Sequence, residues 1–212
     1  MNHELFVKIC GITRSEDAAL SASLGADAIG MIFYPKSKRF VSPDQAKAIA
    51  DVGLSLSVSR VGVFVNPTLL ELEETVKEVS LDFIQLHGHE SPSFVDQARK
   101  IFPEHQFIKA VRLGENDSQL EYSSDYELLD SSSADFGGTG DTISWTEASA
   151  RVKAQTKPIL LAGGLTIENV LQAIDIVKPA GIDLSSGVES APGIKCPEKL
   201  KQFFLKLGRG QS

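Results

Sequence analysis

Cysteines are scarce in this sequence of 212 residues, and the two present, Cys10 and Cys196, lie far apart. They form no C-x-x-C pair, which excludes the usual cysteine-based zinc sites and thioredoxin-like sites. We therefore predict no metal site. Reduced thiols in a cytoplasmic protein are expected, with a single disulfide as the alternative.

Long apolar runs are also absent, so no segment is expected to span a bilayer. Residues 1–4 lack the basic and apolar stretches with which a signal peptide begins. Both features predict a soluble protein that stays in the cytoplasm and has no membrane partner.

Positive charge is in the minority, since 21 Lys and Arg residues stand against 28 Asp and Glu residues, giving a formal net charge of −7. Nucleic-acid-binding proteins rely on a positive field, so no nucleic-acid partner is expected. An anionic ligand would have to be held by local hydrogen-bond donors. Hydrophobic residues make up 42% of the chain, which is enough for a sizeable core and is not typical of disordered proteins.

Short apolar runs alternate with segments of helical period along the whole chain. The runs expected to form strands are 5–10, 28–33, 61–65, 83–86, 107–111, 126–130, 158–162 and 181–184. This alternation indicates a parallel α/β sheet, and about eight units in so short a chain favour a closed (β/α)8 (TIM) barrel. We predict one domain over residues 1–212, with a loose tail at 208–212. The segment 113–124 is polar, so its helix is expected to be short or irregular.

Helix starts are marked by capping patterns. Ser42, Asn66 and Ser91 each precede a proline, which predicts that helices begin there. Thr13 is followed three residues later by a glutamate, which fits a capping box.

Active sites of such barrels lie where strands end and the following loops begin. This rule selects Cys10 after the first strand, Asp130 at the end of the sixth and Asp183 in the eighth. Cys10 is either a small buried hydrophobe or a base, and a base would need a pKa lowered by nearby donors or charge. Asp130 either caps the next turn or donates a proton as a general acid.

The loops after the seventh and eighth strands suit an anion. Gly163 and Gly164 would let backbone N–H groups approach a ligand closely. Ser185, Ser186 and Gly187 could open a short helix whose amides accept a phosphate. Alternatively, the glycines only turn the chain and Ser185 only caps a helix. We favour the phosphate site because both loops occupy the position where this fold recurrently binds phosphate.

Three further side chains have two interpretations each. Lys8 points to the same side of its strand as Cys10, and it either supplies positive potential to the thiol or fills the barrel. Arg39 either grips a carboxylate in a bidentate fork or is a solvated surface charge. His87 is either a site residue or a structural one.

Short motifs follow one another along the chain from residue 7 to about residue 204, and they are KICGI (8–12), GVFVN (62–66), QLHG (85–88), LLD (128–130), GGTG (137–140), AGGL (162–165), SSGVE (185–189) and PGIK (192–195). In type and order they resemble the motifs of the phosphoribosylanthranilate isomerases. Each motif alone is weak, whereas the ordered set is highly specific.

The resemblance implies an isomerase of the aldose–ketose type (an intramolecular oxidoreductase) that acts in tryptophan biosynthesis. It would rearrange N-(5-phosphoribosyl)anthranilate, a phosphorylated sugar amine, to 1-(2-carboxyphenylamino)-1-deoxyribulose 5-phosphate. By motif, Cys10 would be the general base and Asp130 the general acid, with no metal or redox cofactor. Arg39 would meet the anthranilate carboxylate, and Asp183 the amine or hydroxyls. The residues implied to hold the phosphate are Gly163, Gly164, Ser185, Ser186 and Gly187. A monomer or a homodimer is expected.

Two positions depart from the family pattern. Lys38 stands where many members have proline, and Cys196 stands where an acidic helix cap is common. Three other functions stay open from the sequence. The histidine-pathway sugar isomerase would be expected to have a carboxylate in place of Cys10, and indole-glycerol-phosphate synthase would need an added N-terminal segment and a catalytic lysine. A phosphate-binding barrel without catalytic activity is the third.

Overall fold

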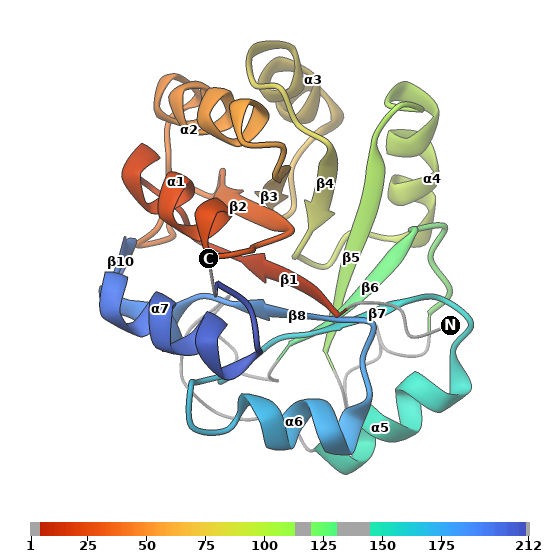
Figure 1. Ribbon diagram of the computed structural model, residues 1–212. Coiled ribbons are helices and arrows are strands. Elements are labelled where there is room, and N and C mark those ends of the chain that lie inside the picture. Colours follow the sequence, from red (N-terminus) through yellow and green to blue (C-terminus); the bar gives the residue numbers. More distant parts are fainter. Residues whose placement is uncertain (1–4, 113–119, 131–144, 211–212) are drawn as a thin grey trace.

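The computed structural model describes residues 5–112, 120–130 and 145–210. The GGTG motif at 137–140 and the end of the predicted tail, 211–212, lie outside these residues. Eight parallel strands close into one barrel in chain order, so the predicted (β/α)8 fold is confirmed (Figure 1). They are β1 (Phe6–Ile9), β2 (Ala28–Ile32), β3 (Ser59–Phe64), β4 (Phe83–Leu86), β5 (Gln106–Arg112), β6 (Tyr126–Asp130), β7 (Ile159–Leu161) and β8 (Gly181–Leu184).

Helices surround the strands, and the last of them lies beside the first (Figure 1). They are α1 (Ser15–Ser23), α2 (Pro43–Ser55), α3 (Leu69–Glu78), α4 (Pro92–Ile101), α5 (Trp145–Ala154), α6 (Val170–Val177) and α7 (Pro197–Lys206). A 3-10 turn, η2 (Ser186–Val188), and a small hairpin of β9 (Glu189–Ala191) and β10 (Ile194–Lys195) follow β8. In the described part of the β5–β6 connection, residues 120–125, there is no helix. None of the described helices is long and apolar enough to cross a membrane.

The predicted helix caps are only partly correct. Ser42 begins α2 with a complete capping box, and the Ser91 hydroxyl accepts from the backbone N–H of Phe94 at the start of α4. The cap of α3 is Thr68 rather than Asn66, whose side chain instead accepts from the backbone N–H of His89 at 2.7 Å. The cap of α1 is Arg14 rather than Thr13, because the Thr13 hydroxyl donates to the carbonyl of Gly193.

At the C-terminal end, the last helix has a cysteine at its cap position. Cys196 precedes α7 and makes no side-chain capping bond to the helix backbone, as expected for cysteine. Beyond that helix, Arg209 lies in the segment predicted to be loose, and its guanidinium bonds to Asp27 and to the carbonyls of Leu5 and Gly25.

The core has an outer layer between strands and helices and an inner layer inside the barrel. At the N-terminal end of the barrel, Phe6, Phe83 and Tyr126 fill the interior, with ring centroids about 6 Å apart (5.9 and 6.3 Å). Toward the carboxyl ends of the strands, the barrel interior contains polar side chains, and Lys8 and Gln85 are fully buried there. The aromatic cluster therefore closes the N-terminal end of the barrel, and a site can form only at the carboxyl ends of the strands.

Candidate active site

A pocket opens at the carboxyl ends of the strands, where the fold places active sites. It is lined by every predicted site residue except Gly187, namely Cys10, Arg39, Asp130, Gly163, Gly164, Asp183, Ser185 and Ser186. His87 also lines it. Within the described ranges, no group of three or more His, Cys, Asp or Glu side chains is arranged to hold a metal ion.

Cys10 directly follows β1, and its backbone N–H donates to the carbonyl of Leu184 at 2.7 Å. The side chain is buried against Gly30, where an added Cβ would come within 2.9 Å of the sulfur. Burial raises the pKa of the Cys10 thiol, and the positive charge of Lys8 offsets this only in part. The lowered pKa that the base interpretation requires is not found, because desolvation outweighs the nearby cation.

Lys8 and Asp183 form a buried ion pair beneath the pocket. Lys8 Nζ donates to Asp183 Oδ2 at 2.8 Å, and the residues are register partners on β1 and β8. Burial disfavours the charged amine, but Asp183 and Cys10 outweigh it and raise the pKa of Lys8. Asp183 Oδ1 is buried and has no hydrogen-bond partner among the described residues, so it can accept from a ligand in the pocket.

Asp130 is held by a side chain that follows β4, two strands away around the barrel. Its Oδ2 lies 2.9 Å from Nε2 of His87, which follows β4. The other ring nitrogen, Nδ1, lies 2.8 Å from the amide nitrogen of Gln85. Sequence reasoning missed Gln85, although the spacing of Gln85 and His87 at a strand end places both side chains on one face.

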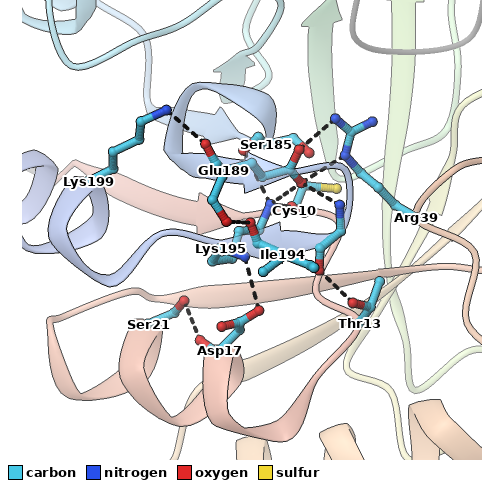
Figure 2. A network of polar contacts seen from close by, with 12 residues as sticks. Cys10, Thr13, Asp17, Ser21, Arg39, Ser185, Glu189, Ile194, Lys195 and Lys199 are labelled. Atoms are coloured by element: carbon cyan, nitrogen blue, oxygen red, sulfur yellow. Dashed lines mark hydrogen bonds and ion pairs between the residues drawn. The ribbon is translucent and has the colours of Figure 1, made fainter.

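A second polar network runs under Cys10 and out to Arg39 (Figure 2). Arg39 donates through Nε and Nη2 to both carboxylate oxygens of Glu189, at 2.8 and 2.7 Å. The fork predicted to meet a ligand carboxylate is thus engaged within the protein, and only Nη1 has no partner among the described residues. Arg39 is not the solvated charge of the alternative interpretation, since Glu189 orients it toward the pocket.

Lys195 is the centre of this network and was also missed from the sequence. Its Nζ donates to the carbonyls of Cys10 and Ser185, at 2.6 and 3.2 Å, and to Glu189 at 2.8 Å (Figure 2). Burial lowers the pKa of Lys195, and Glu189 opposes that effect. Lys195 therefore joins the end of β1 to the loop after β8, and its bond to the Cys10 carbonyl holds the backbone of Cys10 in place.

The two predicted anion loops lie together across the pocket. Gly163 and Gly164 adopt left-handed backbone conformations, with φ of 78° and 64°. Gly187 is required by close packing, because a Cβ there would lie 2.1 Å from the carbonyl of Leu165. The Ser185 hydroxyl is buried without a hydrogen-bond partner among the described residues. The loops can therefore offer a hydroxyl and backbone N–H groups to an anion.

Comparison with known proteins identifies the family. Residues 7–206 match the family model described as N-(5'phosphoribosyl)anthranilate (PRA) isomerase. The chain is 42% identical to the N-(5'-phosphoribosyl)anthranilate isomerase of Thermotoga maritima over 208 residues, covering 96% of this chain and 98% of that protein. It is 44% identical to the enzyme of the same name from Pseudomonas savastanoi over 203 residues, covering 93% and 94%.

Solved structures agree with this result. The crystal structure of phosphoribosyl anthranilate isomerase from Thermus thermophilus superposes with a TM-score of 0.84, at 36% identity, over 96% of this chain and 98% of that one. A phosphoribosyl anthranilate isomerase in complex with reduced 1-(o-carboxyphenylamino)-1-deoxyribulose 5-phosphate superposes with a TM-score of 0.81, at 38% identity, over 97% and 99%. The chain therefore belongs to the N-(5'-phosphoribosyl)anthranilate isomerase family.

Proposed function

We propose that this isomerase of tryptophan biosynthesis works through Cys10 as general base and Asp130 as general acid. As a family member, the chain rearranges N-(5-phosphoribosyl)anthranilate to 1-(2-carboxyphenylamino)-1-deoxyribulose 5-phosphate. The observation that carries the assignment of roles is the shared pocket, in which a thiol at the end of β1 and a carboxyl at the end of β6 both line one cavity.

The reaction needs one acid and one base. Asp130 gives a proton to the ring oxygen, the bond from that oxygen to C1′ breaks, and the amine lone pair forms a protonated imine. The Cys10 thiolate then removes the proton from C2′, and those electrons neutralise the imine to give an enolamine. The enolamine takes a proton at C1′ and loses one from its C2′ hydroxyl, which leaves the ketone. Since no net oxidation occurs, no redox cofactor is needed.

Burial raises the pKa of the Cys10 thiol, and the charge that develops on the substrate offsets this effect. The protonated imine brings a positive charge beside the sulfur only after the ring has opened. At a separation of about 4 Å and an effective dielectric constant of about 20, that charge favours the thiolate by about 4 kcal/mol. This corresponds to roughly a thousandfold stronger acidity of the thiol. The thiol then loses its proton to solvent, and the resulting thiolate removes the proton from C2′.

The remaining predicted residues are proposed to hold the substrate. Arg39 offers Nη1 to the anthranilate carboxylate while Glu189 holds the rest of its guanidinium. Asp183 offers Oδ1, its unpaired oxygen in the described structure, to the amine or a hydroxyl. The phosphate is proposed to bind at the loops of Gly163, Gly164, Ser185, Ser186 and Gly187.

The location and the partners of the enzyme form a separate proposal. The acidic charge supports an enzyme that binds a small phosphosugar rather than nucleic acid. We propose a single-domain cytoplasmic protein without a membrane partner. A relative from Thermotoga maritima is described as dimeric, and we propose a monomer or a homodimer here.

Replacing the two proposed groups tests the assignment of roles. Cys10→Ala and Asp130→Ala should each lower kcat by about 100-fold or more, the contribution of a general acid or base. Cys196→Ala is the matched control, because Cys196 lies outside the pocket at the start of α7. Retained turnover in both pocket variants would reject the roles. Assaying the histidine-pathway sugar alongside shows whether this chain also accepts that substrate.

A further inference from the structure

Three side chains form a chain of contacts from the barrel interior to the proposed acid. Gln85 in β4 is fully buried, and its amide nitrogen lies 2.8 Å from Nδ1 of His87. The opposite ring nitrogen, Nε2, lies 2.9 Å from Oδ2 of Asp130. Gln85 lies deeper in the barrel than the pocket and does not line it, so it acts on Asp130 only through the imidazole.

The placement of the Gln85 amide, with its nitrogen toward His87, sets the direction of each hydrogen bond. An amide nitrogen donates and cannot accept, so Nδ1 of His87 is the acceptor. A neutral imidazole carries its one hydrogen on the other nitrogen, and that nitrogen faces Asp130. Nε2–H therefore donates to Oδ2.

We propose that Gln85 is a positioning residue, which holds His87 in the Nε2–H tautomer so that a donor always faces Oδ2 of Asp130. The inference rests on the proposed function, in which Asp130 is the general acid. With a donor on Oδ2, a proton on the carboxyl is not turned toward the imidazole. After the proton has gone to the substrate, the same N–H stabilises the carboxylate.

The opposite tautomer would undo both effects. A bare Nε2 would accept the carboxyl proton and direct it toward the ring instead of the substrate. It would also leave the carboxylate formed after proton transfer without this donor. The tautomer of His87 therefore bears on the acid step, although neither His87 nor Gln85 needs to exchange a proton with the substrate.

Other contacts hold the loop that carries His87 in place, but they do not determine the tautomer of the ring. The backbone N–H of His87 donates to the carbonyl of Phe64 at 2.8 Å. Buried Lys109 donates to the carbonyl of Gly88 at 2.7 Å and pairs with Glu90 at 3.0 Å. These contacts position the ring without determining which nitrogen is protonated.

The environment of Gln85 also indicates a functional role. Its Oε1 is buried with no hydrogen-bond partner among the described residues. A buried amide with one end unsatisfied is unfavourable for folding, and an apolar side chain of similar length would avoid that cost. Among the described residues, the one side-chain hydrogen bond of Gln85 is its contact with His87.

Gln85→Met separates these two contributions. The ring 15N shifts of His87 are recorded in histidine-labelled protein at alkaline pH, with His87→Asn used to assign them. We expect one Nε2–H tautomer in the native chain and a mixture in Gln85→Met. We also expect kcat to fall on the order of 10-fold, part of what a general acid contributes, with KM little changed. Thermal stability should stay equal or increase.

The matched control is Gln106→Met, since Gln106 is an exposed glutamine at the start of β5. It should keep the tautomer, kcat and KM of the native chain. An Nδ1–H tautomer in the native protein would overturn the proposal, as would a Gln85→Met variant that keeps either the native tautomer or the native kcat. The tautomer is read without turnover, so a failure of the proposed acid role would appear separately, as retained turnover in Asp130→Ala while the native chain shows the expected spectrum.

Discussion

Gly30 leaves the space in which the Cys10 sulfur sits, and filling that space should displace the proposed base. In Gly30→Ala, the new Cβ would lie 2.9 Å from Sγ of Cys10 and 3.1 Å from Cε of Lys8. Ordinary van der Waals contact begins at 3.4 Å, so the sulfur must move by about 0.5 Å. Because a displacement of about 1 Å can cost about 100-fold in rate, we expect kcat to fall about 10-fold.

The stability change in this variant should be modest. Overpacking a barrel interior costs about 1–3 kcal/mol. Replacing glycine within a strand returns roughly 0.5–1 kcal/mol of that cost. The variant should therefore stay folded, with a lower unfolding midpoint in urea and with kcat measured on the folded protein.

Gly62→Ala provides the matched control on the outer face of the barrel. Its Cβ would lie 2.6 Å from Cδ1 of Leu81 and 2.9 Å from Cε2 of Phe64, so it overpacks the layer between strands and helices. A similar or larger loss of stability with native kcat is expected. Equal kcat in Gly30→Ala and the native chain, or equal losses in both variants, would refute the placement of Cys10 as base.

Three further predictions concern charge and burial. Burial raises the pKa of Cys10, so iodoacetamide at neutral pH should modify half-buried Cys196 first, and the labelling rate of Cys10 should rise only at alkaline pH. Faster labelling of Cys10 than of Cys196 at neutral pH would contradict this. Lys195→Met removes a buried partner of Glu189, so it should lower the free energy of unfolding by about 3–5 kcal/mol in urea titrations, and a loss well under 1 kcal/mol would exclude the network from a stabilising role. Partial burial disfavours the charge on Asp82, but hydrogen bonds from Arg60 outweigh it and hold the pKa of Asp82 below 3.8. The folded state thus binds this proton less readily than the unfolded chain, so its stabilisation is complete above about pH 5 and is lost as the pH falls toward 3 and below. Asp82→Asn should make that loss shallower in urea titrations across this range, and an unchanged slope would show that the pair does not contribute.

The sequence predicts the barrel well because its signals are local. Each of the eight strands is an apolar run, and the structure places a barrel strand at every one of them. Cap positions are less reliable, as Asn66 and Thr13 illustrate, because each side chain found a partner distant in the chain. A local pattern cannot reveal that competition.

The residues of the candidate site also differ in whether a local sequence signal can reveal them. Cys10, Asp130 and the glycines of the anion loops could be selected because strand ends converge at one face of a barrel. Lys195 and Glu189 could not, since their contacts to Cys10 and Arg39 join residues 150–185 positions apart. The direction of the Cys10 pKa was also out of reach, because it depends on how far burial outweighs the charge of Lys8.

Isotope effects on two variants test most directly whether Cys10 and Asp130 serve different steps. The substrate is prepared with deuterium at C2′, and kcat is compared with that for the unlabelled substrate in Cys10→Ser and Asp130→Asn. We predict clearly slower turnover of the deuterated substrate by Cys10→Ser, whose weak base makes removal of the C2′ proton limiting. Asp130→Asn should show no such effect, since ring opening limits it. The reverse pattern, or an isotope effect of the same size in both variants, would contradict the assignment of base and acid.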